Sequence, residues 1–142
     1  VGNLAVGGTG KTPHTEYLIR LLQNEGINVA ALSRGYKRKS KGYILATAES
    51  SAGKIGDEPY QIKSKFPDIR VAVDEDRCHG IEQLLKLKNP AVDAVLLDDA
   101  FQHRRVKAGL NILLTDFHRL LCDDVLLPAG RLREPAGGKN RA

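Results

Sequence analysis

The sequence predicts an α/β fold of the P-loop NTPase type, in which helices flank a mostly parallel sheet. A glycine-rich stretch, Val6 to Pro13, lies between the apolar run Val1 to Val6 and a segment with helical periodicity, so the glycines fall at a strand-to-helix turn. Further apolar runs alternate with helical segments, and one of them, Ala91 to Leu97, leads directly into a pair of aspartates. Together these features are typical of a phosphate-binding sheet.

The length and composition of the chain limit the number of domains and the kinds of ligand that we expect. With 142 residues, 42% of them hydrophobic, the chain can form one ordinary core, and we expect one domain over residues 1–142. Because it begins with Val and contains no Met, we interpret it as a piece of a longer protein. Its net charge of +5 suits an anionic ligand, whether nucleotide, phospholipid surface or nucleic acid. No apolar run approaches the ~20 residues that span a bilayer, so we expect this segment to be soluble.

The glycine-rich stretch is suited to bind phosphate. Gly7, Gly8 and Gly10 lack Cβ atoms and can turn consecutive N–H groups inward, where the positive end of the helix dipole adds to their field. Lys11 is placed to reach β- and γ-phosphate oxygens, and the Thr12 hydroxyl to hold Mg²⁺. The predicted nucleotide-binding residues are Gly7, Gly8, Thr9, Gly10, Lys11 and Thr12. Ala5 replaces the first glycine of the strict pattern, which leaves a glycine-rich turn with an incidental lysine as the alternative.

The next elements predict a β-α-β unit. Leucines at helical spacing indicate a helix from Lys11 to Glu25, and Gly26 ends it. The apolar run Ile27 to Leu32 is then typical of a buried parallel strand. Arg34 and Tyr36 follow at its carboxyl end, where ligands of open α/β sheets bind, so an anion-binding loop competes here with a solvated basic turn.

A small hairpin and a second helix are predicted next. Residues 36–38 and 43–47 are expected to pair, and the small polar residues 48–54 to be mobile. Asp57 precedes the second helix. A carboxylate in this position usually caps the helix, but beside a phosphate site it can also deprotonate a hydroxyl nucleophile, which makes Asp57 a candidate general base.

A third strand is predicted over Ile69 to Val73, followed by an acidic cluster and Arg77. Arg77 is a candidate to steady the charge of a transferring phosphoryl group, although a helix-capping ion pair explains the acidic cluster equally well. A helix with apolar residues at 81, 84, 85 and 87 then ends at Asn89-Pro90.

The second anchor of the predicted site is the strand that ends in Asp98 and Asp99. Carboxylates in this position complete a Mg²⁺ site opposite Thr12, and burying them without a cation or hydrogen bonds is costly. His103, shortly after, stays undecided between a structural role and contact with nucleotide or substrate. A last strand is predicted over residues 110–115, and prolines and glycines indicate an ordered loop over 120–142.

Five signatures, in this order, resemble the nucleotide-binding part of the tetraacyldisaccharide 4′-kinase (lipid A 4′-kinase) family. They are Val1-Gly2-Asn3-Leu4 with the glycine-rich loop, Ser33-Arg34-Gly35-Tyr36, Gly56-Asp57-Glu58-Pro59, Asp98-Asp99-Ala100-Phe101-Gln102-His103, and Leu127-Pro128-Ala129-Gly130 with Leu132-Arg133-Glu134-Pro135. Each signature is weak alone, but their joint order is specific and covers nearly the whole chain.

The resemblance implies transfer of the ATP γ-phosphate to the 4′-hydroxyl of a tetraacylated disaccharide 1-phosphate, with Mg²⁺, in lipid A biosynthesis at the cytoplasmic face of the bacterial inner membrane. ATP, the lipid acceptor and the membrane surface are the expected partners. Catalytic roles fall to Asp57, Lys11 and Arg77, and the metal site to Thr12, Asp98, Asp99 and Glu134. Expected substrate contacts are Arg34, Tyr36, His103 and Arg133.

Two positions depart from the family pattern: Ala100 replaces a glycine and Arg131 a proline. The family's N-terminal membrane anchor and its C-terminal region, which supplies a histidine to the catalytic aspartate, lie outside these residues. We therefore expect this chain alone to bind nucleotide but transfer phosphate poorly. A nucleotide-dependent switch or partitioning ATPase is the alternative, disfavoured by Val6 where such proteins often carry lysine. Interspersed charges and 5% aromatic residues argue against nucleic-acid binding.

Overall fold

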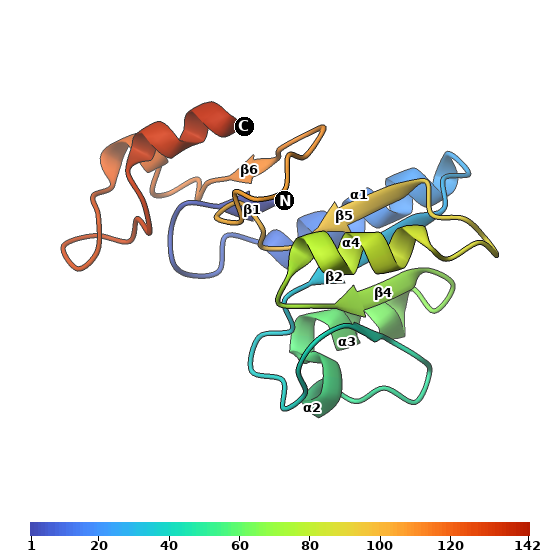
Figure 1. Ribbon diagram of the computed structural model, residues 1–142. Helices are drawn as coiled ribbons and strands as arrows, with labels where there is room; N and C mark the ends of the chain where they lie inside the picture. The colour runs from blue at the N-terminus through green and yellow to red at the C-terminus, as the bar shows by residue number, and fades with distance from the viewer.

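The buried apolar runs of the sequence form the parallel strands of the fold (Figure 1). The computed structural model describes residues 1–142. Its larger sheet has the order β3-β4-β2-β5, in which β2 (Val29–Ser33) pairs in parallel with β4 (Arg70–Val73) and β5 (Ala94–Leu97). Strand β3 (Ile44–Leu45) adds an antiparallel edge. The predicted α/β fold with a mostly parallel sheet is confirmed.

A second, two-stranded sheet continues the first. Strands β1 (Gly2–Asn3) and β6 (Leu113–Leu114) pair in parallel. The backbone nitrogen of Val1 donates to the Leu97 carbonyl at 2.8 Å, and the Ala100 amide donates to the Val1 carbonyl at 3.4 Å. Strand β1 therefore lies beside the carboxyl end of β5, and the loops that follow these two strands emerge at the same edge.

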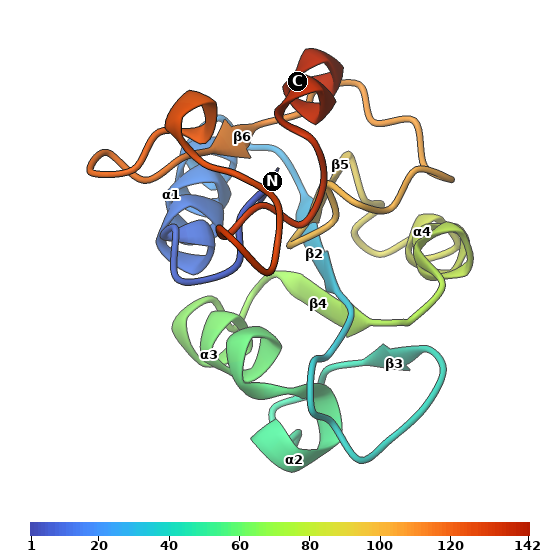
Figure 2. The same ribbon diagram turned by 90° about the vertical axis from the view of Figure 1, so that its left-hand side faces the viewer.

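Helices cover both faces of the larger sheet because the strand residues alternate between two apolar clusters (Figure 2). Helices α1 (Lys11–Asn24) and α3 (Asp57–Lys65) contribute Ile19 and Ile62 to the cluster on one face. Helix α4 (Arg77–Leu85) contributes Leu84 to the other. Short helices lie at α2 (Ala52–Ile55), η1 (Leu121–Asp123) and η2 (Ala136–Arg141). None of the helices is both long and apolar enough to cross a lipid bilayer.

The predicted hairpin is wrong. Residues 36–38 form a turn in which the Arg38 amide donates to the Gly35 carbonyl at 3.2 Å, and Ile44 and Leu45 pair instead with Val73 and Ala72 of β4. The edge of β4 offers these residues apolar neighbours, whereas residues 36–38 are polar. Residues 48–54 were expected to be mobile; in the structure helix α2 begins within them, and Ile55 at its end is fully buried. The last predicted strand, residues 110–115, is shorter in the structure, where β6 comprises only Leu113–Leu114.

The C-terminal loop is tied to the strand that leads into the glycine-rich stretch. The Val6 amide donates to the Arg131 carbonyl at 2.8 Å, and the Arg133 amide donates to the Leu4 carbonyl at 2.7 Å. Leu132 between them is buried in a small cluster with Leu4 and Phe101. The ordered loop predicted for this region is confirmed, and the pairing brings Arg133 beside the glycine-rich loop.

Helix α4 offers a matched test of the packing. Leu84 is fully buried beneath the sheet, whereas its neighbour Leu85 is 60% exposed. We expect Leu84→Ala to lower the free energy of unfolding by about 2–5 kcal/mol because it leaves a cavity in the core. Leu85→Ala should change it by less than about 1 kcal/mol. Urea unfolding followed by circular dichroism measures both; equal effects would show that α4 does not pack on the sheet through Leu84.

Candidate nucleotide-binding site

A polar cavity of about 840 Å³ opens at the carboxyl ends of β2, β4 and β5. Only two of its 14 lining residues are hydrophobic, and four basic side chains face four acidic ones. The charged residues are Lys11, Arg34, Arg77, Arg133, Glu58, Glu75, Asp98 and Asp99. A second cavity of about 960 Å³, between β5 and residues 109–112, is mostly apolar. Of the predicted nucleotide-binding residues, Lys11 and Thr12 line the polar cavity, whereas Gly7, Gly8, Thr9 and Gly10 line neither cavity. The polar cavity has the chemistry to hold both an anion and a cation.

The glycine-rich loop has the conformation that a phosphate site requires. Gly7 and Gly10 have φ of 112° and 75°, a region that residues with a Cβ rarely adopt. Asn3 donates from Nδ2 to Oγ1 of Thr9 at 2.8 Å and braces the loop against β1. Helix α1 begins at Lys11 and has no side-chain cap at its N-terminus, so its first amides are open to an anion.

Asp98 is the most buried acidic group of the site, with 4% exposure. Burial, and after it the negative charge of Asp99, raises the pKa of Asp98, although Thr15 donates a hydrogen bond from Oγ1 to Oδ1 at 3.2 Å. Asp99 is more exposed and has φ of 47°, an uncommon conformation for a non-glycine residue and one that recurs at functional sites. Its Oδ1 lies 3.7 Å from Nζ of Lys11 and 3.6 Å from Nη1 of Arg133.

The oxygen donors fit Mg²⁺. Asp98 and Asp99 line the same cavity as Thr12, as predicted, and a divalent cation would offset the cost of burying two adjacent carboxylates. No group of three or more His, Cys, Asp and Glu side chains could hold a metal ion by itself. This agrees with Mg²⁺ chemistry, because Mg²⁺ is usually held by one or two carboxylates together with waters and substrate phosphates.

Arg77 reaches the site from the start of α4 and is 3% exposed. Its Nη1 donates to the Asp74 carbonyl at 2.5 Å and its Nη2 to the Asp98 carbonyl at 3.4 Å, while Nε has no partner. Burial, and after it the nearby charge of Arg34, lowers the pKa of Arg77. Asp76 caps α4 by accepting from the amides of Cys78 and His79. The acidic cluster therefore caps the helix, and Arg77 is also free to face the site.

The remaining predicted residues divide into two groups. Arg34, Tyr36, His103 and Arg133 line the cavity, and Nδ1 of His103 is buried without a partner. Asp57 is exposed at the first position of α3 and is not among the lining residues, whereas Glu58 is.

Glu134, predicted as a metal ligand, also lies outside the lining. Arg141 holds its Oε1 at 2.7 Å and Arg104 its Oε2 at 3.1 Å. The hydrogen bond from Arg141 is the main reason that the pKa of Glu134 is lowered. With both oxygens engaged by arginines, Glu134 lies in an ion-pair cluster beside the cavity.

Five lining residues were not predicted: Val6, Ser33, Glu58, Glu75 and Gln102. Gln102 donates from Nε2 to the Asn3 carbonyl at 2.7 Å and so connects the loop after β5 to β1. Glu58 and Glu75 stood in acidic clusters that sequence reasoning treated as helix caps. For Glu75 the available signal was its position after the end of β4, the same kind of signal that identified Asp98, whereas Glu58 follows helix α2 and carries no such signal.

The whole chain, residues 1–142, matches the family described as tetraacyldisaccharide-1-P 4′-kinase. The chain belongs to this family. It is 78% identical over 142 residues to the tetraacyldisaccharide 4′-kinase of Bacteroides fragilis and 59% identical over 142 residues to that of Flavobacterium johnsoniae. Each match covers 100% of the chain, which spans 38% and 41% of the length of these relatives.

A solved structure supports the same family. The fold is similar to a crystal structure of LpxK from Aquifex aeolicus in complex with ATP, with a TM-score of 0.86 and 44% sequence identity. That match covers 99% of this chain and 44% of the other.

Both departures from the pattern of the 4′-kinase family fit the backbone. Ala100 does not have positive φ; the left-handed conformation falls on Asp99, so the Cβ of Ala100 adds no strain of that kind. The Arg131 amide donates to Oδ1 of Asp124 at 3.1 Å, a hydrogen bond that proline cannot make.

The raised pKa of Asp98 predicts a specific pH dependence. The folded state holds the proton of Asp98 more tightly than the unfolded state, so without metal this residue lowers stability as pH rises from the unfolded pKa through the folded one. We expect Asp98→Asn to increase the free energy of unfolding at pH 7 in EDTA and to flatten this fall. Urea unfolding between pH 4 and 8 measures the effect, and a less stable Asn variant across that range would contradict it.

Proposed function

We propose that this chain is the nucleotide-binding part of an ATP-dependent kinase that phosphorylates the 4′-hydroxyl of a tetraacyldisaccharide 1-phosphate at the cytoplasmic face of the bacterial inner membrane. One observation supports it above the others: Lys11 and Thr12, at the end of the glycine-rich loop, meet the Asp98–Asp99 pair at one polar cavity. The family name supplies the acceptor and the position of transfer. The ATP complex of the Aquifex aeolicus protein supports the choice of nucleotide.

Different residues around the cavity bind the phosphates, neutralise charge and hold the metal during phosphoryl transfer. The amides of the glycine-rich loop and Lys11 hold the β- and γ-phosphates, and Arg77 and Arg133 offset negative charge on the side facing Asp99. Thr12, Asp98 and Asp99 would hold Mg²⁺, which when bound neutralises charge on the phosphate oxygens. Glu134 is left out of this metal set because its oxygens are held by arginines.

The acceptor side of the site is the wall formed by the loop after β2 and the start of α3. Arg34 and Tyr36 offer a cation and an exposed ring at the cavity, which His103 also lines. A carboxylate at the start of α3 then takes the proton of the attacking hydroxyl. Asp57 is our candidate for this base, and Glu58 is the neighbour that lines the cavity here.

An acceptor assay tests the proposed function. The full-length protein is incubated with γ-labelled ATP, Mg²⁺ and the tetraacyldisaccharide 1-phosphate in detergent micelles. We expect label on the disaccharide, lost when Mg²⁺ is removed with EDTA and when the acceptor lacks its 4′-hydroxyl. Label that appears only in inorganic phosphate would favour a nucleotide-dependent switch or partitioning ATPase instead.

Substitutions at the start of α3 identify the base. In the full-length protein, Asp57→Ala should lower the transfer rate by about 10²–10⁴-fold, the usual contribution of a general base, with the Kd for ATP within about twofold of wild type. Weaker ATP binding together with a lower thermal midpoint would mean that Asp57 is a structural cap. A loss of transfer in Glu58→Ala but not in Asp57→Ala would assign the base to Glu58.

A further inference from the structure

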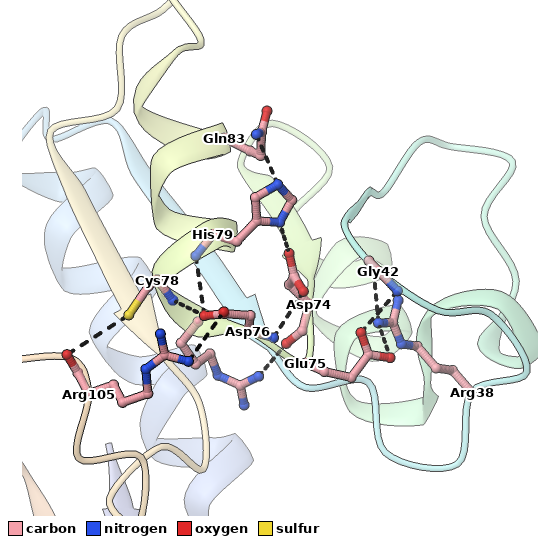
Figure 3. Close-up of polar contacts among 10 residues, drawn as sticks. Arg38, Gly42, Asp74, Glu75, Asp76, Cys78, His79, Gln83 and Arg105 are labelled. Carbon is pink, nitrogen blue, oxygen red and sulfur yellow. Dashed lines mark hydrogen bonds and ion pairs between the residues drawn. The ribbon is translucent and has the colours of Figure 1, made fainter.

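Arg38 lies in the polar loop after β2, yet its side chain is only 2% exposed. Its Nη2 lies 2.7 Å from Oε1 of Glu75 and donates to the Gly42 carbonyl at 2.8 Å. The Gly42 amide in turn donates to Oε2 of Glu75 at 2.9 Å, so the three residues close a ring of hydrogen bonds (Figure 3). This ring joins both ends of the 38–42 turn to the segment that follows β4.

Gly35, packed against the Arg38 side chain, brings the loop close to the start of α3. Gly35 has φ of 72°, and a Cβ there would lie 2.4 Å from Cδ of Arg38 and 2.9 Å from the Ile55 carbonyl oxygen. A Cβ on Gly56, which caps α3, would lie 3.1 Å from Cα of Gly35. Only glycines allow this approach. Ser40 adds a hydrogen bond from Oγ to the Lys54 carbonyl at 2.6 Å.

Three segments that carry site residues therefore come together at the loop that Arg38 anchors, although Arg38 itself does not line the cavity. The loop after β2 carries Arg34 and Tyr36, α3 carries Glu58, and the segment after β4 carries Arg77 two residues beyond Glu75. Burial alone would raise the pKa of Glu75, but hydrogen bonds from its own N–H, Arg38 and Gly42 outweigh burial and lower it. The ring is therefore anionic on one side and cationic on the other.

We infer that Arg38, paired with Glu75, is a positioning residue that holds the Arg34–Tyr36 wall and the start of α3 at the separation from the glycine-rich loop that the acceptor requires. The inference rests on the proposed function, because it concerns the acceptor side of that site. Arginine suits this role since its planar, multi-donor head holds Glu75 and Gly42 together, whereas lysine is a single point charge. The hydrogen bonds and ion pair of Arg38, Gly42 and Glu75 do not involve residues 7–12 of the predicted phosphate-binding loop.

The test separates acceptor binding from nucleotide binding in the full-length protein. We expect Arg38→Gln to raise KM for the tetraacyldisaccharide 1-phosphate, or lower kcat/KM for it, by about tenfold or more through misplacement of the wall, with the Kd for ATP within about twofold. Arg38→Lys should fall between wild type and Gln. Amide hydrogen exchange over residues 34–42 should speed up in the same order.

Arg105→Gln is the matched control. Arg105 pairs with Asp76, the residue after Glu75, at 3.5 Å, but its side chain is 74% exposed. An exposed pair of this kind contributes little, so KM for the acceptor and exchange over residues 34–42 should stay at wild-type values. If Arg105→Gln and Arg38→Gln act alike, the effect is general charge removal and the inference fails.

Other outcomes of these experiments also test the inference. A lower thermal midpoint for Arg38→Gln with an unchanged KM for the acceptor would make Arg38 merely structural, and equal losses for ATP and acceptor would overturn the separation. Should Arg38→Gln not fold, Arg38→Lys and Glu75→Gln carry the same test. If the wild-type protein transfers no phosphate to the disaccharide, the proposed function fails by itself, while hydrogen exchange with ATP titration still shows whether Arg38 fixes the wall.

Discussion

The carboxylate of Asp98 is buried at the end of β5 with Asp99 beside it, and the rest of the site is arranged around this charge. A carboxylate without water needs hydrogen bonds or positive charge close by. Thr15 supplies a hydroxyl, Arg77 a guanidinium against the Asp98 carbonyl, and Lys11 an ammonium near Asp99. Thr15 and Lys11 belong to α1 and Arg77 to α4, so their contacts around Asp98 and Asp99 constrain how both helices pack against the end of β5.

Chain topology brings the charges together. In a parallel sheet all carboxyl ends share one edge, so the loops after β2, β4 and β5 converge there without long connections. Arg133 is the exception, since it arrives from the C-terminal loop through the pairing of Ala5 with Leu132. Its contact with Asp99 at 3.6 Å means that the last part of the chain completes the charge balance at the first loop.

Local patterns were enough to predict the glycine-rich loop, α1, the buried strands and the Asp98–Asp99 pair, because glycine spacing and apolar periodicity act within a few residues. Features that depend on distant partners were not predictable in this way. Strand β3 pairs with β4 because of the apolar edge available there, and Glu134 is engaged by Arg104 and Arg141, which no local spacing reveals. The burial of Arg38 likewise depends on Glu75 and on two glycines that lie 21 residues apart in the sequence.

The charge composition of the cavity explains how one site accommodates opposite ligands. Four basic and four acidic side chains cancel formally, so neither a phosphate nor a divalent cation meets a strongly attractive field overall. The two signs nevertheless come from different elements: Lys11 and the open amides come from the start of α1, and Asp98 with Asp99 from the end of β5, where Lys11 lies 3.7 Å from Asp99. A phosphate that binds Lys11 shares the charge that otherwise faces Asp99, and Mg²⁺ at the aspartates completes its coordination with waters and phosphate oxygens. Only a ligand that combines both charges, such as a metal–nucleotide complex, matches the two halves at once.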